Sequence, residues 1–167
     1  MNFSLQAQTK SKVTHEYMRE TIGKFSERDR ERRMSHEVVA ALIIQSQRIL
    51  LGHRSATRTF YPDVWDVFGG HVEPGEQHHQ ALIRELQEEL GITPTQWSYL
   101  EGISFPSEPS GQVTVHLYLV THWTGTPANH QLEEHSTIDW FSLEQAAQLS
   151  LAHPDYPAIF ARYLAPK

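Results

Sequence analysis

Hydrophobic residues fall in short, dense runs after residue 34, and these runs have the β-branched composition of buried strands. The run Glu37–Ile44, EVVAALII, predicts one strand, and Arg48–Arg54, RILLGHR, predicts the next. We expect these two strands to pair as neighbours across the short turn between them. A third, shorter strand is expected at Val64–Phe68, where the chain runs into a pair of glycines.

A four-residue spacing of apolar side chains replaces this pattern in the middle of the chain. Leucines recur on one helical face at Leu82, Leu86 and Leu90. The segment therefore predicts a helix from about Glu76 to Leu90. Gly91, followed by Pro94, supplies the stop signal.

Strand patterns return in the second half of the chain. Trp97–Phe105 and Val113–Trp123 predict two longer strands separated by the turn-forming cluster PSEPSGQ. The second strand alternates, with Val113, Val115, Leu117 and Leu119 expected on one face and His116, Tyr118 and Val120 on the other. A last short strand, STIDWF, is expected to end at Phe141.

Helix start signals follow the last predicted strand. Ser142 and Gln145 have the spacing of a capping box, which predicts a helix through about Leu149. Pro154 and Pro157 then open a final helix to about residue 164. Helices on either side of a mixed β-sheet define an α/β protein.

The first 33 residues have a different character from the rest. They are polar and end in a dense run of mixed charge, so we expect residues 1–33 to form an N-terminal extension, a linker or a surface helix. The remaining residues, 34–167, suit one domain with a proper core.

Composition narrows the classes of partner and compartment. The formal net charge of −6 and the sequence pI of about 6.0 argue against a basic surface for polymeric nucleic acid. There is no cysteine, no apolar run near the length of a membrane span and no signal-peptide pattern. We expect a cytoplasmic monomer or homodimer that binds a small molecule.

Acidic side chains crowd one side of the predicted helix at Glu85, Glu88 and Glu89. Like charges at these spacings repel one another by a few tenths of a kcal/mol each. A solvated acidic face is one interpretation of such a helix. A bound Mg²⁺ ion is the other, because Mg²⁺ prefers carboxylate oxygens together with substrate phosphates.

The whole stretch from Gly70 to Ile92 decides between these interpretations, because it resembles the Nudix box, G-x5-E-x7-R-E-U-x-E-E-x-G-U, where U is a bulky aliphatic residue. Both gaps have the required length, and every fixed position is filled: Gly70, Glu76, Arg84, Glu85, Leu86, Glu88, Glu89, Gly91 and Ile92. A match at this many positions is far more specific than a short glycine motif.

This resemblance implies a Nudix-type α/β/α sandwich and Mg²⁺-dependent chemistry, with Mn²⁺ as a substitute. By the same resemblance, the metal ligands are three glutamates of the box, Glu85, Glu88 and Glu89, together with the backbone carbonyl of Gly69. Arg84 and Glu76 would orient these carboxylates. Gly70 and Gly91 would be structural parts of the motif.

The general base and the substrate contacts are less closely tied to the box. The base is either Glu85 or a loop glutamate, for which we favour Glu134 over Glu133. Arg54 and Arg58 are candidate phosphate ligands. The candidates for stacking on a nucleobase are Phe60, Tyr61, Trp65 and Phe68. Ordinary packing is the alternative role for each of these side chains.

The activity implied by the resemblance is hydrolysis of a diphosphate linkage in a nucleoside diphosphate derivative. We expect a nucleoside triphosphate or an oxidised purine form to yield the monophosphate and pyrophosphate. Cleavage of ADP-ribose or another nucleotide sugar is an alternative, and so is a nucleotide sensor without turnover. The 11 histidines include the adjacent pair His78 and His79 and the nearby pair His130 and His135, but none of them forms H-E-x-x-H. Imidazole suits zinc or other transition metals better than Mg²⁺, so we do not expect a histidine metal site.

Overall fold

The computed structural model describes residues 35–107 and 111–164; the predicted N-terminal extension lies outside them. The first two strands are β1 (Ser35–Gln45) and β2 (Arg48–Arg54). They pair antiparallel, with Ile44 opposite Ile49, as their hydrophobic patterns predict. Ser46 and Gln47 make the turn between them with positive φ, the geometry that suits the twist of a tight hairpin.

Seven strands of the described residues form one mixed sheet in the order β3-β2-β1-β6-β5, with β4 beside β1 and β7 beside β2. The other strands are β3 (Trp65–Asp66), β4 (Phe68–His71), β5 (Thr93–Ser107), β6 (Gly111–Thr124) and β7 (His135–Phe141). β1 and β6 pair in parallel, whereas the remaining pairs are antiparallel.

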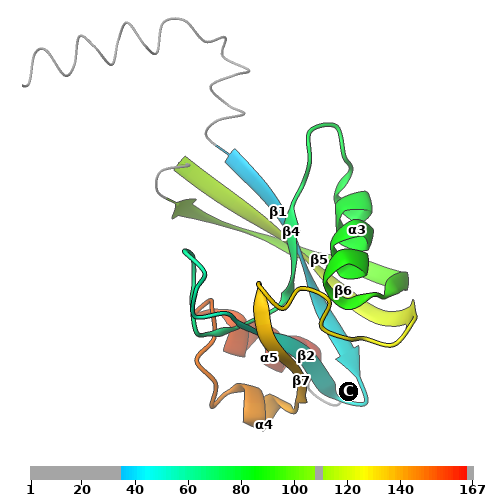
Figure 1. The fold of residues 1–167 in the computed structure, drawn as a ribbon, viewed down its shortest axis with the longest axis vertical. Helices are drawn as coiled ribbons and strands as arrows, with labels where there is room; N and C mark the ends of the chain where they lie inside the picture. The colour runs from blue at the N-terminus through cyan, green and yellow to red at the C-terminus, as the bar shows by residue number, and fades with distance from the viewer. Residues whose placement is uncertain (1–34, 108–110, 165–167) are drawn as a thin grey trace, which may run out of the picture.

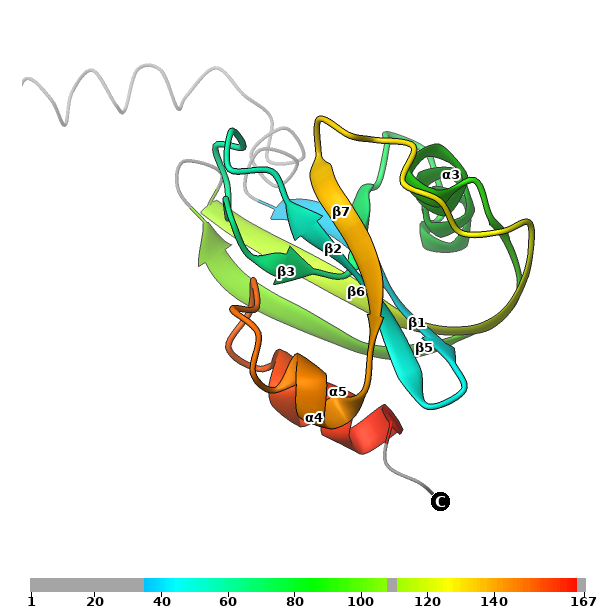
Figure 2. The same ribbon diagram turned by 60° about the horizontal axis from the view of Figure 1, so that its bottom comes forward.

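Helices cover both faces of this sheet (Figures 1 and 2). α3 (His78–Leu90) lies on one face, and α4 (Leu143–Ala146) and α5 (Tyr156–Leu164) lie on the other. The predicted α/β/α sandwich is therefore confirmed. No helix in the described part of the chain is long and apolar enough to span a lipid bilayer.

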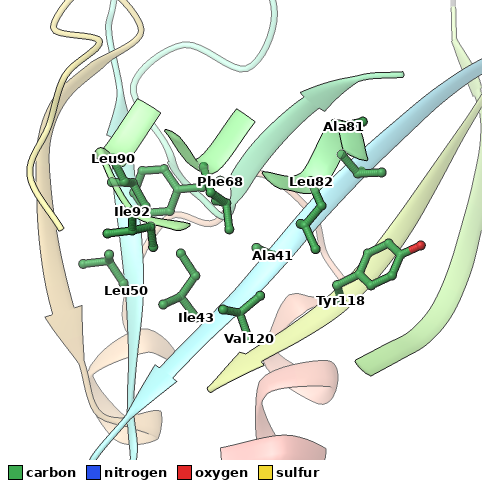
Figure 3. Packing of buried hydrophobic residues seen from close by; sticks show 12 residues of the cluster. Ala41, Ile43, Leu50, Phe68, Ala81, Leu82, Leu90, Ile92, Tyr118 and Val120 are labelled. Atoms are coloured by element: carbon green, nitrogen blue, oxygen red, sulfur yellow. The ribbon is translucent and has the colours of Figure 1, made fainter. Parts of the chain in front are cut away.

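The core between α3 and the sheet contains alternate residues of β1, namely Val39, Ala41 and Ile43. Leucines from the four-residue repeat of α3 pack against them (Figure 3). Phe68 lies in the same cluster and is fully buried. The periodicity of each element thus places its apolar side chains on the face that the other element covers.

A second core fills the opposite face, where Leu42 of β1 and Leu117 of β6 pack against Phe160 of α5. Tyr118 and Val120 belong to the first core. The alternation predicted for β6 is therefore confirmed, and both of its faces are covered.

Several predicted boundaries need correction. The segment expected as one strand at Val64–Phe68 forms two strands, β3 and β4, that pair with different partners. β5 begins at Thr93 rather than Trp97 and includes Pro94, because β5 is an edge strand where a missing N–H group costs little. α4 ends at Ala146 rather than near Leu149.

α3 begins at His78 rather than at Glu76. The carboxylate of Glu76 accepts a hydrogen bond from the backbone N–H of Glu73, 3.0 Å away, and Gly75 has a positive φ. These features close a turn before the helix begins. Glu76 is thus left free of the helix to meet another partner.

Candidate active site

The guanidinium of Arg84 binds the carboxylates of Glu76 and Glu85. Its Nε and Nη2 atoms each donate to a carboxylate oxygen of Glu76 at 3.0 Å, while Nη1 donates to Glu85 Oε1 at 2.8 Å. Nη2 also donates to the backbone carbonyl of His71 at 3.0 Å. A planar fork of donors suits this set of acceptors.

Burial and the guanidinium of Arg84 shift the pKa of Glu85 in opposite directions. Burial raises the pKa of Glu85, and the hydrogen bond from Arg84 opposes that rise. Gly70 lies directly beside this carboxylate, since a Cβ atom there would come within 2.4 Å of Glu85 Oε1. The fixed glycine of the box therefore makes room for the fixed glutamate.

Glu88 and Glu89 face different surroundings although they are adjacent. Glu88 is half-exposed, with one oxygen 3.6 Å from Arg84 Nη1. Glu89 is only 3% exposed and accepts a 2.8 Å hydrogen bond from the backbone N–H of Gly69. Burial, followed by the charges of Glu134 and Glu85, raises the pKa of Glu89 well above its ordinary value.

Gly69 and Gly91 occupy backbone positions where a side chain would clash. Gly69 has a φ of 148°, and a Cβ atom there would overlap the carbonyl oxygen of Val39. Gly91 ends α3 in the left-handed conformation with a φ of 68°. A Cβ atom at Gly91 would come within 2.3 Å of the ring of His130.

The loop before β7 brings Glu134 to the helix. Arg58 Nη2 lies 2.6 Å from Glu134 Oε1, and the N–H of Ser55 donates to the Glu134 carbonyl at 2.8 Å. The potential ligand atoms of Glu89, Glu134 and His135 all lie within 4.8 Å of one another. Two of the predicted site residues, Glu89 and Glu134, thus meet across the fold.

His135, which we did not expect to bind a metal, lies beside Glu89 and Glu134. It is 2% exposed, and neither ring nitrogen has a hydrogen-bond partner among the described residues. Burial lowers its pKa to about 4, so the ring is neutral at ordinary pH. Its ring packs on Phe68 and occupies the space that a Cβ atom at Gly52 would fill. Its position immediately after Glu134 was the available signal.

The predicted substrate residues divide into three cases. Arg58 lies at the site because it pairs with Glu134. Arg54 donates to the carbonyls of Phe60 and Tyr61 at 3.0 and 3.1 Å, so its guanidinium holds a loop. The stacking role expected of Phe68 is wrong, because Phe68 is fully buried in the core.

The described residues fit a divalent cation. A buried carboxylate, a second carboxylate and a neutral imidazole without hydrogen-bond partners converge at Glu89, Glu134 and His135. The carboxylate oxygens and ring nitrogens of such groups remain unsatisfied unless a cation or a hydrogen-bond partner reaches them. A Mg²⁺ ion bound here would neutralise phosphate charge and make a nearby water more acidic.

The chain matches the family model described as NUDIX domain over residues 34–163, so it belongs to the Nudix family. It is 41% identical over 126 residues to the CTP pyrophosphohydrolase of Escherichia coli (strain K12), covering 75% of this chain and 89% of that protein. It is 40% identical over 75 residues to the 8-oxo-dGTP diphosphatase of the same organism, covering 45% and 55% of the two chains.

Solved structures agree with this assignment. The solution structure of the E. coli ORF135 protein matches with a TM-score of 0.66 and 33% identity over 81% of this chain and 96% of that chain. The crystal structure of MutT NUDIX hydrolase from Burkholderia pseudomallei matches with a TM-score of 0.68 and 27% identity over 77% and 96%. The predicted family, fold class and enzyme class, a Nudix hydrolase, are confirmed.

Proposed function

We propose that this chain hydrolyses nucleoside triphosphates to nucleoside monophosphates and pyrophosphate. The observation that carries the proposal is the convergence of buried Glu89 of α3 with Glu134 and His135. These groups together bind a cation that grips a diphosphate. Glu85 and Glu88 lie on the same helix as Glu89, and the backbone N–H of Gly69 donates to Glu89. In this proposal both glutamates and the carbonyl of Gly69 complete the ligand set.

Arg84 is a positioning residue in this proposal. Its bonds to Glu76 and Glu85 hold both carboxylates in one orientation, so Glu85 does not have to be ordered when substrate arrives. Preorganised charge of this kind lowers the free energy of the transition state more than charge that must first be ordered.

Glu134 is the proton acceptor that we assign. Glu89 is too deeply buried to meet an incoming water, and the side chain of Glu85 is less exposed than that of Glu134. Glu134 is partly exposed, and the pairing of its Oε1 with Arg58 holds the carboxylate in place beside Glu89. Exposed Glu133 serves as the matched control at this position.

We assign the nucleobase contact to the loop that precedes β3, because Phe68 is buried. Phe60 and Tyr61 are exposed aromatic residues on this loop, which Arg54 holds and Arg58 ties to Glu134. Exposed rings next to a phosphate site are suited to stacking on a base. We assign an oxidised or deoxy purine triphosphate as the preferred substrate.

A cytidine nucleotide is the second candidate. The relative named CTP pyrophosphohydrolase is 41% identical and covers 75% of this chain, more than the relative named for 8-oxo-dGTP covers. Stacking alone does not distinguish these bases, because every base has an aromatic face.

Product analysis with purified protein and Mg²⁺ tests these assignments. The substrates are 8-oxo-dGTP, dGTP, CTP and ADP-ribose, and chromatography separates nucleotides, pyrophosphate and orthophosphate. We expect monophosphate with pyrophosphate, and the highest kcat/KM for 8-oxo-dGTP. Orthophosphate as the first product would reject the proposed bond, whereas faster turnover of CTP or ADP-ribose would reject the purine assignment. Tight binding without any cleavage would indicate a nucleotide sensor.

A further inference from the structure

Histidine side chains gather at the N-terminal end of α3, about two helical turns or more before Glu85, Glu88 and Glu89. His78 is the first residue of α3, His116 lies on β6 and Glu37 lies on β1. Their potential ligand atoms all lie within 4.8 Å of one another. Three elements that are distant in sequence thus bring two imidazoles and one carboxylate together.

The register of the sheet explains this meeting. β1 and β6 run in parallel with Val39 opposite His116, and Glu37 lies two positions before Val39 on the same face. That face is the one covered by α3, because Val39 and Tyr118 belong to the core beneath the helix. The apolar layer under α3 therefore ends in a polar group at the first turn of the helix.

Direct contacts already join the three side chains. The rings of His78 and His116 lie with centroids 3.9 Å apart and planes inclined by 34°. The carboxylate of Glu37 contacts Nε2 of His116. Burial, followed by the charge of His116, lowers the pKa of His78, which favours the neutral ring that binds metals.

We propose that Glu37, His78 and His116 form a second metal site, which binds a divalent transition metal ion of the zinc class and leaves one position open to water. Two imidazoles and a carboxylate are a ligand set that suits Zn²⁺ and its neighbours better than Mg²⁺. Ligand atoms around a tetrahedral zinc lie about 3.3 Å apart, so small side-chain rotations complete the site. All three residues are partly exposed, which gives the ion a path from solvent.

This site is separate from the acidic one. His78 precedes Glu85 by seven residues, which is about 10 Å along a helix. The two sites also differ in donors, because carboxylates dominate one and imidazoles the other. An ion at the histidine site ties the first turn of α3 to the two central strands of the sheet, and so stabilises the helix that carries the catalytic carboxylates.

The test is a calorimetric titration of tag-free, full-length protein with Zn²⁺ in a large excess of Mg²⁺. We expect Zn²⁺ to bind, and at 100 times its Kd to raise the Tm by about 5–10 °C. His78→Ala and His116→Gln should each weaken Zn²⁺ binding by at least about tenfold. His122→Ala is the matched control, since His122 is an exposed histidine on the same strand.

A Glu89→Gln variant separates this site from the acidic one. Zn²⁺ binding that survives Glu89→Gln but is lost in both histidine variants supports the proposal. The proposal is overturned if wild-type protein binds no Zn²⁺ under these conditions, if both histidine variants bind Zn²⁺ as wild type does, or if His122→Ala loses binding equally. His78 lies at the end of a helix, so His78→Ala remains a valid test even if His116→Gln does not fold.

Discussion

The donors of Arg84 reach Glu76, Glu85 and the carbonyl of His71 together, in directions that a lysine ammonium cannot match. We expect Arg84→Lys to lower kcat by about 10–100-fold, because both carboxylates lose their fixed orientation. Steady-state kinetics at saturating Mg²⁺ provide the measurement. Arg162→Lys is the control, since Arg162 pairs with Glu101 on the surface. Unchanged kcat in Arg84→Lys would reject the positioning role.

The glutamates themselves give the second prediction. Glu88→Gln and Glu89→Gln each remove one negative charge from the proposed cation site, so turnover should fall roughly 100-fold while the fold is retained. Activity is measured across a Mg²⁺ titration, with Glu133→Gln as the control. Full activity of both variants at ordinary Mg²⁺ concentrations would contradict the metal assignment.

Glu89 also links the site to stability. Its pKa in the folded, metal-free protein lies well above the ordinary value of 4.5. Folding therefore favours the protonated form, and stability is lost as the pH rises from the ordinary pKa towards the folded one. In EDTA, Glu89→Gln should match the Tm of wild type near about pH 4 and exceed it near about pH 8. At the higher pH, the Tm of the variant should exceed that of wild type by about 2–4 °C for each kcal/mol added to the free energy of unfolding. An equal difference at both pH values would contradict this linkage.

The end of α3 gives a prediction at the scale of the element. Gly91 and Gly75 both have positive φ, but a Cβ atom would meet the His130 ring at Gly91 and nothing within 4 Å at Gly75. We expect Gly75→Ala to cost about 1 kcal/mol from backbone conformation alone. Gly91→Ala should lower the free energy of unfolding by more, because the helix end must also shift. Urea unfolding compares the two, and equal losses would argue against the clash.

Elements with strong periodicity were predictable from the sequence, and elements set by long-range pairing were not. Local patterns predicted three elements: the leucine repeat predicted α3, the β-branched run predicted β1, and the capping box at Ser142 predicted the start of α4. Nothing local separates β3 from β4, because their division depends on which strand each one pairs with. Pro94 looks like a stop signal until its strand is known to lie at the edge of the sheet.

The site shows the same division. The Nudix box placed Glu85, Glu88 and Glu89 on one helix because their spacing is local. The buried states of Glu89 and His135 arise from packing between distant segments, so neither could be read from spacing. Phe68 was misassigned for this reason: an aromatic residue before a glycine pair has the same local sequence whether it faces solvent or the core.

The whole molecule gives the last prediction. All of the residues assigned to the two sites lie between Glu37 and His135, and residues 1–33 lack the apolar periodicity of a core element. A chain that begins at Met34 should therefore fold and keep its kcat/KM within about twofold of full length. Circular dichroism and steady-state kinetics check both points. A truncated protein that folds but lacks activity would show that the N-terminal segment contributes to the site.

The parallel pairing of β1 with β6 also affects how the chain is synthesised. β2 and β4 cover one edge of β1 soon after it emerges, but Ser35 pairs with Gln112, about 77 residues later. At about 5–20 residues per second, the other edge of β1 waits roughly 4–15 s for its partner on the ribosome. During that interval the unpaired N–H and C=O groups on this edge of β1 face solvent, where a neighbouring nascent chain can pair with them.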